Sequence, residues 1–385
     1  MKTYKEVIIG DYIIGLAVFI QPVLILLQHV LIDVFRMDPD ATTTYRVVLT
    51  AIPMIMAIFV GVRRKPARFL VVYVIVFLVL LLTISFFPAN ERYVKYEGTR
   101  FLLPLVIPSA VCLTVVVNMD VLKKSIYIMA WMAAVLVLYY IASFFMGRFV
   151  IDHYNMSFSY GCLLPMVVLF SQHKVFPTIV SLVMFITVIA IGSRGGAIIF
   201  VAYVLIDVLI NRRKGRWYVL LLGILFVIAL PSLMAFFDSI SISSRTMSLL
   251  NSGDITYDSG RDNIYQKCLD VLLENPVLGV GLFGDRAVLG GAYCHNLFLE
   301  IGMNYGLFFG LFVVLSMIVL FGKSYFTAKG EDRSLLMVMT FSCLLPYMVS
   351  GSYLISNNVA LWLGIMLLLI RDSRHKQGRV CHEKK

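Results

Sequence analysis

The sequence His295-Asn296-Leu297-Phe298-Leu299-Glu300 ends the one long polar segment of an otherwise apolar chain. This segment begins at Asp238, and apolar runs flank it on both sides. We therefore expect a long loop outside the membrane, between two membrane-spanning helices. Arginines, the histidine His295 and the glutamate Glu300 lie in this loop or at its edge, which makes it the candidate functional region. Its other polar landmarks are Ser244-Arg245, Asp258-Ser259-Gly260-Arg261 and the turn signal Asn275-Pro276.

The composition of the whole chain predicts an all-α polytopic membrane protein. Of its 385 residues, 60% are hydrophobic and 14% are charged, and the mean hydropathy is +0.89. A soluble domain could not cover so much apolar surface with polar side chains. We expect a single integral membrane domain over residues 1–385. No small-residue cleavage site follows the first apolar run, so we expect that run to be retained as an anchor.

The six cysteines are scattered and form no C-x-x-C pair, so the sequence shows no zinc or redox motif. Cys268 and Cys294 share the long loop. They would form a disulfide in an oxidising compartment or remain free thiols, and the sequence leaves both alternatives open. No pair of carboxylates in the outer loops has metal-ligand spacing, so we expect no metal and no other cofactor.

Apolar runs predict twelve membrane spans, because a spanning helix needs roughly 20 mainly apolar residues. The turn Gly192-Ser193-Arg194-Gly195-Gly196 divides residues 175–211 into two of these spans. Prolines at positions 104, 108, 165, 231 and 346 fall within the spans and predict kinks. The expected spans are 12–32, 46–62, 69–87, 101–118, 125–146, 157–171, 175–192, 195–211, 217–237, 296–321, 334–350 and 355–371.

Basic residues orient this bundle, since cytoplasmic loops are enriched in lysine and arginine. The side that carries both termini has 22 of the 33 Lys and Arg residues, and the other side has 14 of the 22 acidic residues. We therefore expect both termini in the cytoplasm and residues 238–295 outside. Clusters such as Arg63-Arg64-Lys65 act as topology signals whose partners are anionic lipid headgroups, which argues against nucleic acid as a partner despite the net charge of +11.

The charged residues of the outer edge favour an enzyme over a transporter. An ion-coupled transporter of lipid or oligosaccharide would be expected to carry ionisable residues near the membrane midplane. In this chain almost none lie there. The charged and titratable residues at the expected outer edge are Arg194, Arg245, Arg261, Arg286, His295 and Glu300.

Arg194 lies in the glycine turn between two expected spans. Glycines let a ligand approach the backbone closely, and a helix that starts at Gly195 directs its free N–H groups to the same place. A guanidinium can hold a phosphate through two hydrogen bonds. The alternative is an arginine that only extends to the membrane interface.

A short amphipathic helix is predicted within the loop, with Asp258 or Ser259 as its N-cap. Asn275-Pro276 ends this helix. Arg261 would lie in its first turn, either as part of the functional site or paired with a surface carboxylate. The apolar face has helical spacing and consists of Ile264, Cys268, Val271 and Leu272.

His295 is the candidate general base, because histidine is the side chain best able to take up a proton near neutral pH. A lone histidine is more often structural. Its surroundings decide otherwise: His295-Asn296, followed after nine residues by Gly306, resembles the His-Asn-x9-Gly pattern of the bacterial O-antigen polymerase and O-antigen ligase superfamily. The resemblance extends over about residues 185–320. Other motifs also resemble that family and occur in the same order along the chain. They are Ser193-Arg194-Gly195, Arg245, Ser259-Gly260-Arg261 and Asn275-Pro276-x-x-Gly279-x-Gly281, and Gly310 follows Gly306.

This resemblance implies a membrane glycosyltransferase of the bacterial inner membrane. Its donor would be an undecaprenyl-diphosphate-linked oligosaccharide bound at the outer face. The family's arginine-rich site implies that Arg194, Arg245 and Arg261 hold the diphosphate, and that His295 assists the acceptor hydroxyl. Glu300 would orient His295 or bind sugar.

The chemistry agrees with these roles. Displacement of a diphosphate from an anomeric carbon builds negative charge on the leaving group, and fixed cations stabilise that charge where it develops. We expect a polymerase that joins repeat units of O-antigen or capsule, with a chain-length regulator as a protein partner. The alternative is a ligase that transfers finished glycan to the lipid A core of lipopolysaccharide. A lipid or oligosaccharide transporter is the third and least favoured hypothesis.

Overall fold

The computed structural model describes residues 4–150, 155–191, 194–210, 232 and 261–383, and every regular element in these ranges is a helix. Four of the described helices are long and apolar enough to cross a membrane, and a bent pair of helices at the N-terminus adds a fifth candidate span. These helices are those of a helical multi-pass membrane protein. The four are α3 (Pro39–Arg64), α4 (Pro66–Phe86), α7 (Met119–Phe145) and α15 (Leu297–Thr327).

Most other expected spans coincide with shorter helices or with broken runs of helices. The span 355–371 coincides with α17 (Asn358–Glu383), an unbroken helix of 26 residues that is not among the candidate spans, and 217–237 lies outside the described residues. The count of twelve therefore stays a prediction. The remaining elements, in which η marks a π- or 3-10 helix, are α1 (Tyr4–Val18), α2 (Gln21–His29), η1 (Val30–Val34), η2 (Pro88–Asn90), α5 (Glu91–Tyr93), η3 (Val94–Val106), α6 (Ile107–Leu113), α8 (Met156–Ser171), α9 (Val175–Ala190), α10 (Arg194–Ile210), α13 (Arg261–Glu274), α14 (Gly284–Val288), α16 (Glu331–Met339), η4 (Thr340–Leu344), η5 (Leu345–Met348) and α17 (Asn358–Glu383).

The first expected span, 12–32, is not one straight helix. The chain bends by 45° between α1 and α2. Pro22 lies in the first turn of α2, and a proline ring cannot continue a helix that arrives from its N-terminal side, because it lacks an N–H group and clashes with the preceding turn. Hydropathy is the same on both sides of the bend and therefore does not reveal it.

Exposed apolar side chains on α4 show why this helix requires a lipid environment. Leu70, Val71, Phe77 and Leu82 are each more than half exposed. A helix that is apolar all round and has little packing partner in the protein is stable only where hydrocarbon covers it. The same holds for much of α3, whose apolar window is 17% buried.

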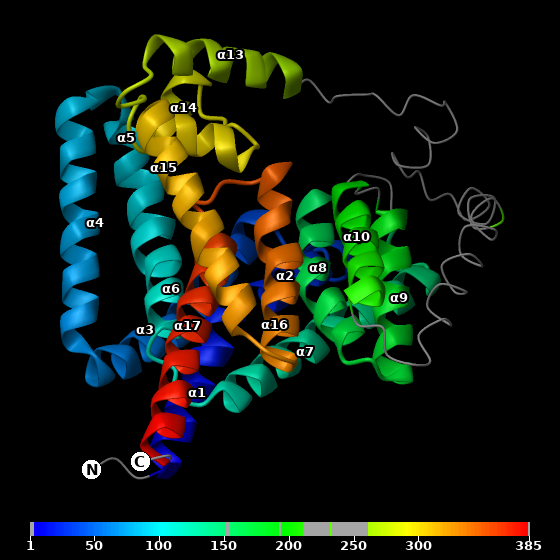
Figure 1. The fold of residues 1–385 in the computed structure, drawn as a ribbon. Helices are drawn as coiled ribbons and strands as arrows, with labels where there is room; N and C mark the ends of the chain where they lie inside the picture. The colour runs from blue at the N-terminus through cyan, green and yellow to red at the C-terminus, as the bar shows by residue number, and fades with distance from the viewer. Residues whose placement is uncertain (1–3, 151–154, 192–193, 211–231, 233–260, 384–385) are drawn as a thin grey trace. The chain divides into compact units, whose positions relative to one another are not determined.

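The chain forms two compact units, and the division between them falls inside α3 and α7. In the first unit (Met1–Phe19, Thr50–Ser125 and Asp258–Lys385), α17 packs against α6, α15 and α16, and α13 packs against α15. Figure 1 shows α17 in red beside α15 in gold. In the second unit (Ile20–Leu49 and Ile126–Tyr257), α8 packs against α2, α9 and α10.

Candidate functional site

The segment between α13 and α15 in the first unit carries Arg286 and His295, with Arg261 on α13 and Glu300 on α15, and its backbone is tightly turned. Many of its residues adopt positive φ angles, which L-amino acids other than glycine avoid. His295 has a φ of +55° and is one of two non-glycine residues in this set. Such strain persists only where surrounding contacts impose it, and it concentrates at functional sites. The positive-φ residues are Gly279, Gly281, Phe283, Gly290, Gly291 and His295.

Two of the motif glycines are required by a close approach of backbones. A Cβ on Gly279 would lie 2.3 Å from the Met303 carbonyl oxygen, and a Cβ on Gly306 would lie 2.5 Å from the Val277 carbonyl oxygen. Gly306 breaks α15 with φ +78° and ψ 173°, a region that only glycine occupies readily. The Val280 N–H donates to the Met303 carbonyl at 2.7 Å. The loop after α13 is therefore held against the kink of α15, which the sequence predicts as an unbroken span.

Packing of α13 confirms its predicted apolar face. Cys268 and Leu272 are buried in one cluster with Met303 and Cys294, and Ile264 and Val271 pack against it. This cluster attaches α13 to α15 and to the residue that precedes His295. The helix ends at Glu274, directly before Asn275-Pro276, as predicted.

Arg286 is the centre of a buried polar network in this segment. Its Nη1 donates to both Asp285 carboxylate oxygens at 2.7 and 2.8 Å and to Glu300 Oε1 at 2.7 Å. Its Nε donates to Glu97 at 3.1 Å, and its Nη2 donates to the Ser352 hydroxyl at 2.5 Å. Arg286, Asp285 and Glu300 have at most 1% of their side chains exposed. The network connects α14 to η3, α15 and the loop before α17.

Glu300 is held by this network on both carboxylate oxygens. Oε1 accepts from Arg286 and from the Ser352 hydroxyl, and Oε2 accepts from the Tyr353 N–H at 3.3 Å. The sequence predicts that Glu300 binds substrate or orients His295. The Glu300 side chain is buried, so a direct contact with substrate would require the residues that cover it to move.

His295 differs from Arg286 in that its ring is not satisfied by the protein. The Nδ1 atom is buried and has no hydrogen-bond partner among the described residues. The ring packs on Tyr293 with a centroid distance of 4.3 Å. Burial, and then the positive charge of Arg261, lower the pKa of His295 below its ordinary value of 6.5. A neutral imidazole with a free ring nitrogen is able to accept a proton.

Asn296 fixes the backbone beside this histidine. Its side-chain oxygen caps α15 by accepting from the Phe298 and Leu299 N–H groups at 3.0 and 3.2 Å. Its amide nitrogen donates to the Met348 carbonyl at 3.1 Å. His295 thus has a strained backbone and a ring nitrogen without a partner among the described residues, and the neighbouring Asn296 anchors the backbone at this point.

Residues 179–315 match the O-antigen ligase family. The match covers a little over a third of the chain and confirms the resemblance drawn from the motifs. It indicates a membrane enzyme with a function of the O-antigen ligase or polymerase type, resembling a glycosyltransferase. No curated protein and no solved structure matches the chain.

Within this family assignment, the predicted site residues have different outcomes. Arg261 begins α13, is partly exposed, and acts electrostatically on His295. Arg194 begins α10 in the second unit. Arg245 and the predicted caps Asp258 and Ser259 lie outside the described residues.

The sequence placed Arg286 at the outer edge but outside the three arginines assigned to the diphosphate, and it did not reveal the network. Asp285 beside it was the one local signal, because a charged pair next to a glycine turn is unusual in a loop. The distant partners Glu97 and Ser352 give no such signal.

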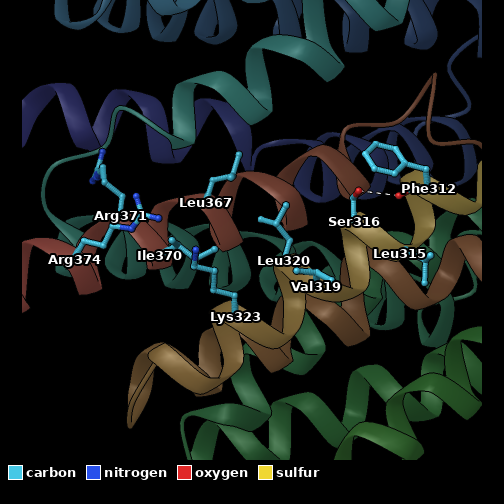
Figure 2. Close-up of a pocket in the computed structure, with 10 residues that line it drawn as sticks. All are labelled: Phe312, Leu315, Ser316, Val319, Leu320, Lys323, Leu367, Ile370, Arg371 and Arg374. Carbon is cyan, nitrogen blue, oxygen red and sulfur yellow. Dashed lines mark hydrogen bonds between the residues drawn. The ribbon is translucent and has the colours of Figure 1, made fainter. Parts of the chain in front are cut away.

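A cavity of about 1020 Å³ lies in the first unit between α15 and α17, away from the His295 segment in the sequence. Figure 2 shows an apolar wall that includes Leu320 and Leu367, with Lys323, Arg371 and Arg374 toward one end. Arg371 also donates to the Thr114 carbonyl at 2.6 Å. In the described residues there is no group of three or more histidine, cysteine or acidic side chains able to hold a metal ion.

Proposed function

We propose that this protein is a repeat-unit polymerase of surface polysaccharide, either O-antigen or capsule. It transfers glycan from an undecaprenyl-diphosphate donor to a sugar hydroxyl at the outer leaflet of the bacterial inner membrane. The observation that carries this proposal is the strained, unpartnered His295 beside the Asn296 cap, within the match to the O-antigen ligase family. A pKa below 6.5 keeps His295 neutral at physiological pH and ready to act as a base.

In the proposed step, His295 removes the proton from the acceptor hydroxyl as its oxygen bonds to the anomeric carbon of the donor sugar. The bond from that carbon to the diphosphate oxygen breaks, and the leaving group takes the electron pair. Arg261 stabilises the developing negative charge without a metal ion, since a guanidinium can bind two phosphate oxygens at once. Arg194 and Arg245 are the further arginines proposed for the diphosphate from the motifs.

Glu300 contributes, in this proposal, by fixing the segment that carries His295. Its carboxylate bonds Arg286, and Arg286 packs at 5.6 Å over the ring of Tyr293, which in turn contacts His295. This chain of contacts gives a way for Glu300 to orient the histidine. Glycan binding by Glu300 is retained as the second role.

The topology belongs to the same proposal: one membrane domain of twelve spans with both termini in the cytoplasm. Membrane lipids are proposed as partners. The cavity between α15 and α17 is a proposed lipid site, in which the acyl chain would lie against the apolar wall and the lipid phosphate would bind Lys323 and Arg374. A chain-length regulator is the proposed protein partner.

The decisive experiment supplies purified protein in nanodiscs with the undecaprenyl-diphosphate repeat unit as its only substrate and separates the products by length. A ladder of added units supports the polymerase. A single transfer that occurs only after lipid A core is added supports the ligase, the second candidate, with which the same family match is equally compatible. If no product forms in either arm, the transferase hypothesis is contradicted and the transporter becomes the favoured hypothesis.

The variant that tests the general base is His295→Ala. It should lower the transfer rate on the order of 10²–10⁴-fold, the usual contribution of a general base. The protein should still insert and elute as wild type. His173→Ala is the control, because it makes the same change at the turn between α8 and α9, on the expected cytoplasmic side. Near-normal polymer from His295→Ala would falsify the assignment of the base.

A further inference from the structure

Cys268 and Cys294 are in direct contact. Their Sγ atoms lie 3.2 Å apart, and both residues are fully buried. Cys268 lies on α13, and Cys294 lies in the loop immediately before His295. The apolar cluster around them, which includes Leu272 and Met303, fixes both side chains from several directions. Two thiols held in this way need only a small rotation to approach a bonding distance of about 2.05 Å.

The other described cysteines do not share this arrangement. Cys112 and Cys162 lie within helices and make no sulfur–sulfur contact among the described residues, and Cys343 contacts the thioether of Met339. A metal does not explain the pair either, since a structural zinc site needs four ligands and the described residues contain no such group.

We propose that Cys268 and Cys294 form a disulfide bond that ties α13 to the His295 segment. This inference rests on the proposed function, which places residues 238–295 on the oxidising outer side of the membrane, where disulfides form and persist. The oxidant is a protein thiol–disulfide oxidoreductase in its oxidised form, which acts before the cluster closes over the two thiols.

The exchange balances as two successive substitutions at sulfur. The Cys268 thiolate attacks one sulfur of the oxidoreductase and expels the other sulfur as a thiolate. Cys294 then attacks the Cys268 sulfur of the mixed disulfide and expels the oxidoreductase. Two protons leave the cysteines, and two electrons remain on the reduced oxidoreductase.

The bond would act on the site because of what lies at its two ends. Arg261 begins the helix that carries Cys268, and His295 follows Cys294 directly. The enclosed segment, from Cys268 to Cys294, contains Arg286 and two of the motif glycines, Gly279 and Gly281. A disulfide there restricts how far the arginine and the histidine can separate when the loop opens locally.

The test purifies the full-length protein under non-reducing conditions, blocks free thiols with a maleimide in denaturant, and identifies linked peptides by mass spectrometry. All but two of the six cysteines should be labelled before reduction, and one linked peptide pair should contain Cys268 and Cys294. Cys268→Ala should abolish the pair and leave Cys294 labelled. Cys112→Ala is the matched control, because it removes another buried thiol and should leave the pair intact.

A second arm separates failure of this inference from failure of the proposed function. Reduced protein is exposed to copper-phenanthroline, with dioxygen as electron acceptor. If all six thiols are labelled after expression and no link forms with copper either, the geometric inference is overturned. If the link forms only with copper, the outward location of the loop is overturned, and with it the disulfide in cells. Transfer activity and His295→Ala are measured separately and are not decided by either result.

Discussion

Arg286 and His295 lie in the same short segment, yet the protein treats them in opposite ways. Every nitrogen of the Arg286 guanidinium donates to a carboxylate or a hydroxyl, and its side chain is fully buried. His295 keeps a buried ring nitrogen without a partner in the described part of the chain, on a backbone with φ +55°. A satisfied network stabilises one arrangement, whereas an unsatisfied polar atom costs stability and is retained for another reason. The contrast separates a structural centre from a reactive group.

Charge makes the same distinction among the arginines. Three carboxylates, those of Glu97, Asp285 and Glu300, surround the single guanidinium of Arg286. Their combined negative charge would repel a diphosphate, and each of the three guanidinium nitrogens of Arg286 already donates to a protein group. Arg261 is partly exposed, and its positive charge acts on His295. Of these two arginines it is therefore the better candidate to bind the anionic leaving group.

The strongest test of this contrast is Arg286→Ala. Removal of one partner from a buried ion pair leaves uncompensated charges and costs about 3–5 kcal/mol of stability. We expect the variant to lose its thermal transition in detergent or to melt far below wild type, with activity lost as a consequence. Size-exclusion profiles after heating measure this directly.

Arg261→Ala is the matched substitution at the other arginine. It should leave the melting temperature close to wild type and lower the transfer rate on the order of 10²-fold, the loss typical of one electrostatic donor. The comparison fails if both variants unfold to the same extent, or if Arg286→Ala remains as stable as Arg261→Ala.

The fold was predictable from sequence as far as local patterns reach. Spacing on α13 predicts its packed face, Cys268 and Leu272 included, because apolar periodicity reports directly which side of a helix is buried. Apolar runs predict the positions of the described helices for the same reason. The bend before Gln21-Pro22 had a local signal in the proline.

The site was predictable only in part, because its contacts are distant in sequence. Motifs identified His295 and the glycines, but Glu97 and Ser352 meet Arg286 across most of the first unit and follow no short pattern. Gly306 was recognised as a motif residue while its span was interpreted as continuous, since hydropathy carries no information about φ. Its close approach to Val277 appears only in three dimensions.

Gly306→Ala tests whether this kink holds the segment that carries His295. The backbone conformation alone costs about 1–3 kcal/mol for a residue other than glycine, and the added Cβ would meet the Val277 carbonyl. We expect lower thermal stability and reduced transfer together. Gly322→Ala is the control on the same helix, because no atom lies within 4 Å of its Cβ position. Equal melting temperatures for the two variants would contradict a structural role for the kink.

The smallest expected effect is a change in pH dependence, and it reports on His295 alone. Because the pKa of His295 is lowered, the neutral base persists below pH 6.5, and transfer should decline only as pH falls through that lowered value. Arg261→Gln removes a positive charge that lowers this pKa, so the acidic limb should move to higher pH. Lys267→Gln, an exposed cation on the same helix, should leave the limb in place. The profile is measured as initial transfer rate at subsaturating donor. A limb above pH 6.5 in wild type, or one that Arg261→Gln leaves unmoved, would show that the titrating group is not a histidine next to Arg261.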